Sequence, residues 1–114
     1  MTPNPILDFG IDKESIQFVG DGLQRPECIL AEHDGTLWSA DARGGVVRIA
    51  PDGPQELITQ KRSERFSAAK DEASQYLTGT LPNGLAFAKN GDILISNFGT
   101  DCFDVLSRNG SSRG

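Results

Sequence analysis

Short apolar stretches alternate with turn-forming residues along most of the chain, and this pattern predicts β-strands. The turns are marked by a glycine that follows Asp, Asn or Gly, as in Asp34-Gly35 and Asn90-Gly91. These pairs favour tight hairpins because they tolerate the positive φ that such turns need. The strands predicted between the turns are residues 15–19, 28–32, 36–40, 46–50, 56–59, 85–88, 92–96 and 103–107. Short strands at this spacing predict an all-β meander.

The two halves of the chain repeat this pattern. Residues 26–29, Pro-Glu-Cys-Ile, align with residues 82–85, Pro-Asn-Gly-Leu, at an offset of 56 residues. The same offset gives further equivalent pairs: Asp41 with Asn97, Val47 with Phe103, and Ile49 with Val105. By the turns at residues 52–53 and 109–110 the offset is 57, so one residue has been inserted. We interpret the alignment as an internal repeat.

A repeat of three or four short antiparallel strands in about 40–50 residues is typical of a β-propeller blade. We therefore expect one partial propeller over residues 1–114, with about two blades and an N-terminal strand. Residues 14–59 are the first blade region, and residues 81–110 are an incomplete second blade. Residues 60–80 break the strand pattern and are expected to form a connector or a short helix.

Two blades do not close a ring. A propeller of four to eight blades needs roughly 180–350 residues, whereas this chain has 114. Alone, it would expose unpaired strand edges and the apolar faces that neighbouring blades cover. We expect a fragment of a larger protein, with a self-associating protomer as the alternative.

The charge balance excludes two classes of partner. The chain carries 11 Lys and Arg residues against 16 Asp and Glu residues, a net charge of −5, and has no basic cluster. Nucleic acids and anionic membrane surfaces are therefore not expected to bind it. There is neither an apolar run of about 18 residues nor a signal-peptide pattern at the N-terminus. We expect a cytoplasmic protein in which Cys28 and Cys102 are free thiols.

One pair of repeat-equivalent residues suggests a metal site. Glu27 and Asn83 each follow a proline and precede the innermost strand of a blade. Innermost strands line the central channel, so the two side chains would point towards one axis. Oxygen ligands of this kind suit a hard divalent cation such as Ca²⁺ or Mg²⁺. The alternative is that Asn83 serves a Pro-Asn-Gly turn and Glu27 is simply solvated.

Three further residues are weaker candidates for substrate binding. Asp41 and Asn97 are equivalent under the repeat, and Arg43 follows Asp41 closely enough to reach a ligand hydroxyl. The alternative for Asp41 and Asn97 is a turn residue that bonds its neighbouring backbone. For Arg43 the alternative is a solvated loop arginine.

At this point the sequence resembles a known family. The segments "RPECILAEHDGTLWSADARGGVVRIAPDG" and "LPNGLAFAKNGDILISNFGT" resemble the gluconolactonase/regucalcin (senescence-marker-protein) family, with strictosidine-synthase-like propellers as near relatives. The resemblance covers about residues 14–110, and residues 81–87 are its most specific part. It implies a six-bladed propeller with one divalent metal (Ca, Mg or Zn) in the channel, acting on sugar lactones.

The resemblance also suggests roles for individual residues. Asn83 matches the metal-ligating asparagine of the family's Pro-Asn-Gly motif, and Glu27 matches its ligating glutamate. The chain departs from the family in reading Pro-Glu-Cys at residues 26–28, where Glu-Gly-Pro is usual, and in separating the two ligands by one blade. No position here matches the family's ligating aspartate, which serves as the base. The catalytic residue is therefore unassigned, and we expect the isolated chain to be inactive.

Two other functions remain open beside the metal-dependent lactonase. A propeller can be a non-catalytic module that binds a partner at its channel mouth. A strictosidine-synthase-like lyase would act without this metal chemistry. Fold alone does not choose between the three.

Overall fold

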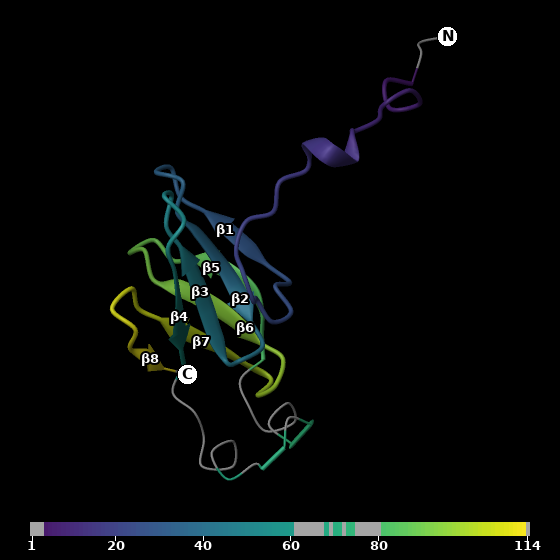
Figure 1. Ribbon diagram of the computed structural model, residues 1–114. Helices are drawn as coiled ribbons and strands as arrows, with labels where there is room; N and C mark the ends of the chain where they lie inside the picture. Colours follow the sequence, from purple (N-terminus) through teal and green to yellow (C-terminus); the bar gives the residue numbers. More distant parts are fainter. Residues whose placement is uncertain (1–3, 61–67, 69, 72, 75–80, 114) are drawn as a thin grey trace.

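The computed structural model describes residues 4–60, 68, 70–71, 73–74 and 81–113. These residues form two four-stranded antiparallel sheets, which lie one against the other, and one short 3-10 helix, η1 (Lys13–Ser15) (Figure 1). The first sheet consists of β1 (Ile29–Ala31), β2 (Leu37–Asp41), β3 (Gly45–Ile49) and β4 (Gln55–Thr59). The second consists of β5 (Pro82–Phe87), β6 (Ile93–Asn97), β7 (Cys102–Leu106) and β8 (Ser112–Arg113). The all-β class predicted from the sequence is confirmed.

Each sheet is a simple meander in which every strand pairs with the next along the chain. The glycine-containing turns produce this order, and glycines 35, 53, 91 and 110 have the positive φ predicted for them. In the Gly44-Gly45 pair the positive φ lies at Gly44, and Gly45 begins β3. β6 lies 56 residues after β2 at both of its ends. The strands of the two sheets therefore follow the sequence repeat.

The extra residue of the second half lies in the turn between β6 and β7. Leu37 pairs with Ile49 in the first sheet, whereas Ile93 pairs with Leu106 in the second, so the offset is already 57 in β7. The equivalences of Val47 with Phe103 and of Ile49 with Val105 were therefore wrong by one residue. Ile49 matches Leu106, and both are buried. The longer turn holds Asp101 at a φ of 54°.

The core lies between the two sheets. The first sheet contributes Trp38, Ala40 and Val46, and the second contributes Leu85, Ile93, Ile95 and Leu106. These positions alternate along β2 and β6, as expected for strands with one face turned to the core. Each large side chain buried here contributes about 1.5–3 kcal/mol to the free energy of unfolding.

The opposite face of the first sheet is crossed by the segment that precedes β1. Leu23 is half-buried there, and a side chain at Gly20 would contact both Leu23 and Ile49. The backbone of Asp21 exchanges two hydrogen bonds with the side chain of Gln55, at 2.6 and 2.9 Å. The segment thus buries the outer side of β3 without being a strand itself.

The strand predicted at residues 15–19 is absent. Ser15 ends η1, and residues 16–19 are extended but paired with no described strand. Phe18 is 93% exposed, and Figure 1 shows the segment leading away from both sheets. A strand needs a neighbouring edge for its backbone hydrogen bonds, and no edge of the described chain lies beside these residues.

Most of the predicted connector at residues 60–80 lies outside the described residues, so the choice between a loop and a helix stays open there. The second sheet extends beyond residue 110, where the predicted second blade ended, because Ser112 and Arg113 form a short fourth strand, β8.

Candidate functional site

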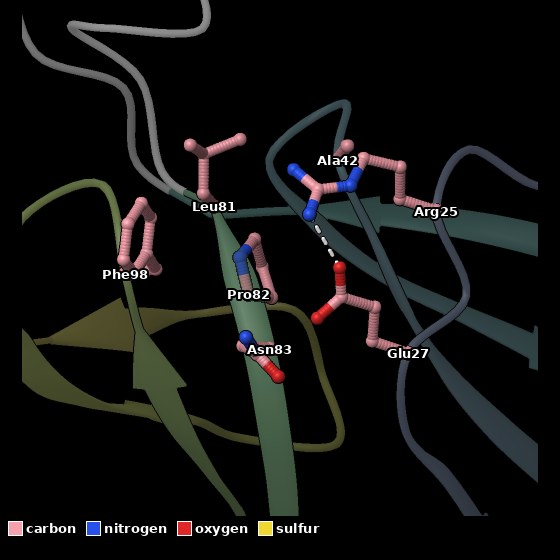
Figure 2. Close-up of a pocket in the computed structure, with 7 residues that line it drawn as sticks. All are labelled: Arg25, Glu27, Ala42, Leu81, Pro82, Asn83 and Phe98. Carbon is pink, nitrogen blue, oxygen red and sulfur yellow. Dashed lines mark hydrogen bonds and ion pairs between the residues drawn. The ribbon is translucent and has the colours of Figure 1, made fainter.

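Glu27 and Asn83 line the same small pocket. It lies where the two sheets meet, and its wall is completed by Arg25, Ala42, Leu81, Pro82 and Phe98. Figure 2 shows the Glu27 carboxylate turned towards β5, on the side where Pro82 and Asn83 lie. The hollow measures about 20 Å³, which is room for about one water molecule or one ion. The structure thus brings together the two residues that the repeat made equivalent.

The backbone at both positions is irregular, and this irregularity exposes the side chains. Pro82 pairs with Asn97 and Gly84 pairs with Ser96, so Asn83 is the extra residue of a β-bulge in β5. A bulge re-aims a side chain out of the regular alternation of a strand. On the other side, Arg25 has a φ of 48° and its carbonyl accepts a hydrogen bond from the Glu27 amide at 2.8 Å.

Arg25 is a residue of this pocket that sequence reasoning missed. Its guanidinium donates to the Glu27 carboxylate, and both side chains remain partly exposed, at 53% and 37%. The only available signal was its position two residues before Glu27, across Pro26. The ion pair neutralises the one carboxylate in the pocket wall. Within the described residues, the Asn83 side chain makes no hydrogen bond.

Asp41 is fully buried at the end of β2, where it accepts four hydrogen bonds. Two come from the Arg43 guanidinium at 2.8 Å each, and one each from the backbone N–H groups of Arg43 and Gln24 at 2.9 and 3.0 Å. Burial by itself would raise the pKa of Asp41, but these donors outweigh it and hold the pKa below its usual range. The geometry favours the turn role that was the alternative for Asp41.

Asn97 occupies the equivalent place at the end of β6. Its Oδ1 accepts from the backbone N–H groups of Leu81 and Gly99 at 2.8 and 3.1 Å. Its Nδ2 donates to Asp104 at 2.7 Å, and the same Asp104 oxygen accepts from Gln60 Nε2 at 2.9 Å. Gln60 Oε1 is buried with no hydrogen-bond partner in the described part of the chain. Asp104 carried no signal, since the misplaced insertion had aligned Phe103, not Asp104, with Val47.

The three predicted substrate-binding residues do not line the Glu27 pocket. Their neighbours Ala42 and Phe98 do so. Asp41 is fully buried, and the almost fully buried Asn97 lines a neighbouring hollow together with Asn83 and Phe98. Arg43 is 42% exposed, but its guanidinium is engaged by Asp41. A substrate role for these residues remains a prediction without a contact to support it.

The donor set fits a divalent cation in part. Two side-chain oxygens, one of them charged, face a space of ionic size, and a hard cation prefers oxygen ligands. In residues 4–60 and 81–113 and the few described between them, no group of three or more His, Cys, Asp or Glu side chains is placed to hold a metal. The pocket therefore offers two ligands of an incomplete site.

Neither a scan against protein-family models nor a search of curated proteins finds a match to this chain. Among the residues that the structure describes, no helix combines the length and apolar character needed to cross a bilayer. The predicted location in the cytoplasm stays a prediction.

Proposed function

We propose that this chain supplies two blades of a β-propeller that hydrolyses sugar lactones with the help of a divalent cation. One observation carries the proposal: Glu27 and Asn83, which the repeat makes equivalent, line one pocket between the two sheets. Two consecutive meander sheets packed face to face are the arrangement that neighbouring blades adopt. The remaining blades and ligands come from outside these two sheets.

The chain's own part in the reaction is to hold and orient the cation. Glu27 supplies a negative charge and Asn83 a neutral oxygen, and the buried side chains of Leu81 and Pro82 form the apolar part of the wall beside them. A bound cation polarises the lactone carbonyl towards attack by water. No described residue near the pocket is placed as the base, so the group that takes the proton from water belongs to another blade.

Arg25 makes the proposal testable because it competes with a cation for Glu27. Replacing it as Arg25→Gln removes the positive charge from the pocket and frees the carboxylate. We expect this variant to bind Ca²⁺ or its luminescent analogue Tb³⁺ at least tenfold more tightly than the unchanged chain. Glu27→Gln in the same background should abolish that gain, and Asn83→Ala should reduce it.

Titration of Tb³⁺ luminescence provides the measurement, with Glu56→Gln as the matched control. Glu56 is an exposed carboxylate on β4, away from the pocket, so its loss should leave the affinity unchanged. Equal affinity of the Arg25→Gln and Arg25→Gln/Glu27→Gln chains would remove the metal site from the proposal. Turnover of a sugar δ-lactone by the purified 114-residue chain would contradict the expectation that its site is incomplete.

A second candidate is a non-catalytic binding propeller, and the Arg25–Glu27 ion pair favours it. The pocket's only carboxylate is already neutralised, and the exposed ring of Phe98 lies beside it, so the pocket suits a small uncharged group of a larger ligand without any metal. If no variant binds a cation, a non-catalytic binding function explains the pocket better than a metal site.

A further inference from the structure

Three asparagines in the chain are followed by glycine, and the fold holds their side chains differently. Glycine has no side chain to obstruct its backbone nitrogen, so in an Asn-Gly pair this nitrogen can attack the asparagine side chain. The three pairs begin at Asn83, Asn90 and Asn109, and all three asparagines are exposed. Exposure therefore does not distinguish the pairs, whereas the hydrogen bonds of the side chains do.

Two of the three side chains are held by hydrogen bonds within their turns. Asn90 Oδ1 accepts from the backbone N–H of Asp92 at 3.0 Å, and Asn90 Nδ2 donates to the Asp92 carboxylate at 3.1 Å. Asn109 Oδ1 accepts from the backbone N–H and the hydroxyl of Ser111, at 3.1 and 2.6 Å, and from the Ser107 hydroxyl. These bonds must break before either Cγ can turn towards the next amide.

Of the three side chains, that of Asn83 makes no hydrogen bond in the described part of the chain. Asn83 is the extra residue of the bulge in β5, where the regular pairing with β6 is interrupted. The attacking amides do not separate the pairs, since Gly84 lies in the ladder opposite Ser96, and Gly91 and Gly110 donate to turn carbonyls at 2.9 and 3.0 Å. The unbonded side chain therefore singles out Asn83.

We propose that Asn83 deamidates spontaneously and is the preferred deamidation site of this protein in its folded state. The Gly84 nitrogen forms a bond to Asn83 Cγ, the Cγ–Nδ2 bond breaks, and ammonia leaves with the amide proton of Gly84. Water then opens the resulting succinimide ring at one of its two carbonyls. One opening gives aspartate, and the other gives isoaspartate, whose main chain is longer by one carbon. The net reaction consumes only water and needs no oxidant or reductant.

Deamidation adds a carboxylate beside Glu27. The two residues line one pocket, and Figure 2 shows the Glu27 carboxylate turned towards the strand that carries Asn83. Before the reaction the pocket wall holds one carboxylate and the Arg25 guanidinium that neutralises it. Afterwards its net charge is negative, and a larger number of charged ligands raises the affinity of a site for Ca²⁺. This consequence rests on the proposed function, whereas the deamidation itself does not.

Peptide mapping by mass spectrometry tests the site. The folded protein is incubated at mildly alkaline pH, and the conversion of each asparagine to aspartate and isoaspartate is followed with time. We expect Asn83 to convert about tenfold faster than Asn90 and Asn109, because the bonds that must break slow the other two. In concentrated urea the three rates should converge. Equal rates in the folded chain, or a faster rate at Asn90 or Asn109, would overturn the proposal.

Gly84→Ala is the matched variant for the mechanism. A Cβ at Gly84 would meet only the Ser96 Cβ, at 3.5 Å, so the variant should fold, while its methyl group hinders attack by the amide nitrogen. The rate at Asn83 should fall at least tenfold, and the rates at Asn90 and Asn109 should not change. An unchanged rate at Asn83 would contradict attack by the Gly84 amide.

Asn83→Asp separates the deamidation from its effect on cation binding. This variant carries the second carboxylate from the start, and we expect it to bind Tb³⁺ about tenfold more tightly than the unchanged chain. Glu27→Gln in the same variant should remove that gain. If Asn83 deamidates but Asn83→Asp binds Tb³⁺ no better, the proposed cation site fails and the deamidation site stands. If Asn83→Asp binds more tightly but Asn83 does not deamidate, the opposite holds.

Discussion

At the scale of single residues, Asp41 shows how a buried charge can hold two segments together. Its oxygens accept hydrogen bonds from the backbone N–H of Gln24, in the segment before β1, and from that of Arg43, in the turn after β2. A buried carboxylate costs several kcal/mol of desolvation unless its oxygens are bonded, and here four donors meet them. Asp41 therefore fixes the path by which the chain enters the first sheet.

Removing this carboxylate should destabilise the protein markedly. Asp41→Ala leaves the Gln24 and Arg43 N–H groups without their acceptor, and we expect a loss of about 3 kcal/mol in the free energy of unfolding at pH 7. Arg43→Lys keeps a positive charge but not the two-pronged contact, so its effect should be about 1 kcal/mol. Urea denaturation followed by tryptophan fluorescence of Trp38 measures both.

The stability difference between the unchanged chain and the Asp41→Ala variant should depend on pH. The pKa of Asp41 is lowered in the folded state, so its contribution is present above the unfolded value of about 3.9 and is lost as pH falls through the folded value. The difference in unfolding free energy between the unchanged and Asp41→Ala chains should therefore shrink below about pH 4. A difference that stays constant down to pH 2 would contradict the role of the charge.

At the scale of the elements, the two sheets hold the segment before their first strand by equivalent hydrogen bonds from different side chains. The backbone N–H of Ala42 donates to the carbonyl of Gln24, and that of Phe98 donates to the carbonyl of Leu81, at 2.8 and 2.9 Å. Asp41 and Asn97 reinforce these contacts from equivalent positions. The repeat therefore conserves an arrangement of bonds even where the side chain changes from a carboxylate to an amide.

Two glycines on strands differ in whether their surroundings have room for a side chain. A Cβ at Gly45 would lie 2.0 Å from the backbone oxygen of Ile58, whereas one at Gly84 would meet only the Ser96 Cβ at 3.5 Å. Gly45→Ala should force β3 and β4 apart and cost about 3 kcal/mol or more, while Gly84→Ala should change the melting temperature little. Thermal unfolding of the two variants gives the comparison, and equal effects would refute it.

The sequence predicted a strand correctly where the stretch has a neighbouring strand to pair with in the fold. The hairpins around Asp34-Gly35 and Asn90-Gly91 were predictable because local turn chemistry and alternation agree there. Residues 15–19 have the same local pattern but no neighbouring edge, so pattern alone overpredicted a strand. The bulge at Asn83 and the insertion before β7 shift the register without leaving a mark on the hydrophobic pattern, which is why Asp104 was missed.

At the scale of the whole molecule, Arg108 links the two sheets. It extends from the turn between β7 and β8, and its guanidinium lies 5.7 Å from the ring centres of both Trp38 and Phe87. It donates to the Glu32 carboxylate and to the Gly91 carbonyl, and Trp38 Nε1 also donates to Glu32 at 3.1 Å. Hydrogen bonds from Arg108 and then from Trp38 hold the pKa of Glu32 below its usual range.

Arg108→Ala should loosen the packing of one sheet on the other. We expect a loss of about 1–2 kcal/mol in the free energy of unfolding, mostly from the lost cation–π and stem contacts. Arg108→Lys should recover only part of this, because an ammonium does not reproduce the planar fork. Arg113→Ala, on the exposed strand β8, is the control and should stay within about 0.5 kcal/mol. Comparable losses for Arg108 and Arg113 would show that Arg108 does not join the sheets.

The sequence predicted that Glu27 and Asn83 lie together, but it did not predict the ion pair between Arg25 and Glu27. The repeat alone placed Glu27 and Asn83 side by side, because equivalent positions in stacked sheets fall at the same end. Nothing in the pattern showed that Arg25 would turn back across Pro26 to neutralise Glu27, since a φ of 48° at an arginine is a tertiary outcome. Ion pairs of this kind appear only once the fold sets the direction of each side chain.

The anchors around Gln60 and Leu81 have a consequence for engineering. Gln60 is fixed by its backbone bond to Gly44 and by its side chain on Asp104, and Leu81 is fixed by Asn97 and Phe98. Both residues are thus bonded to the sheets, one on each side of the segment that joins them. A foreign peptide inserted between Gln60 and Leu81, such as an epitope or a protease site, would leave these bonds to the sheets in place.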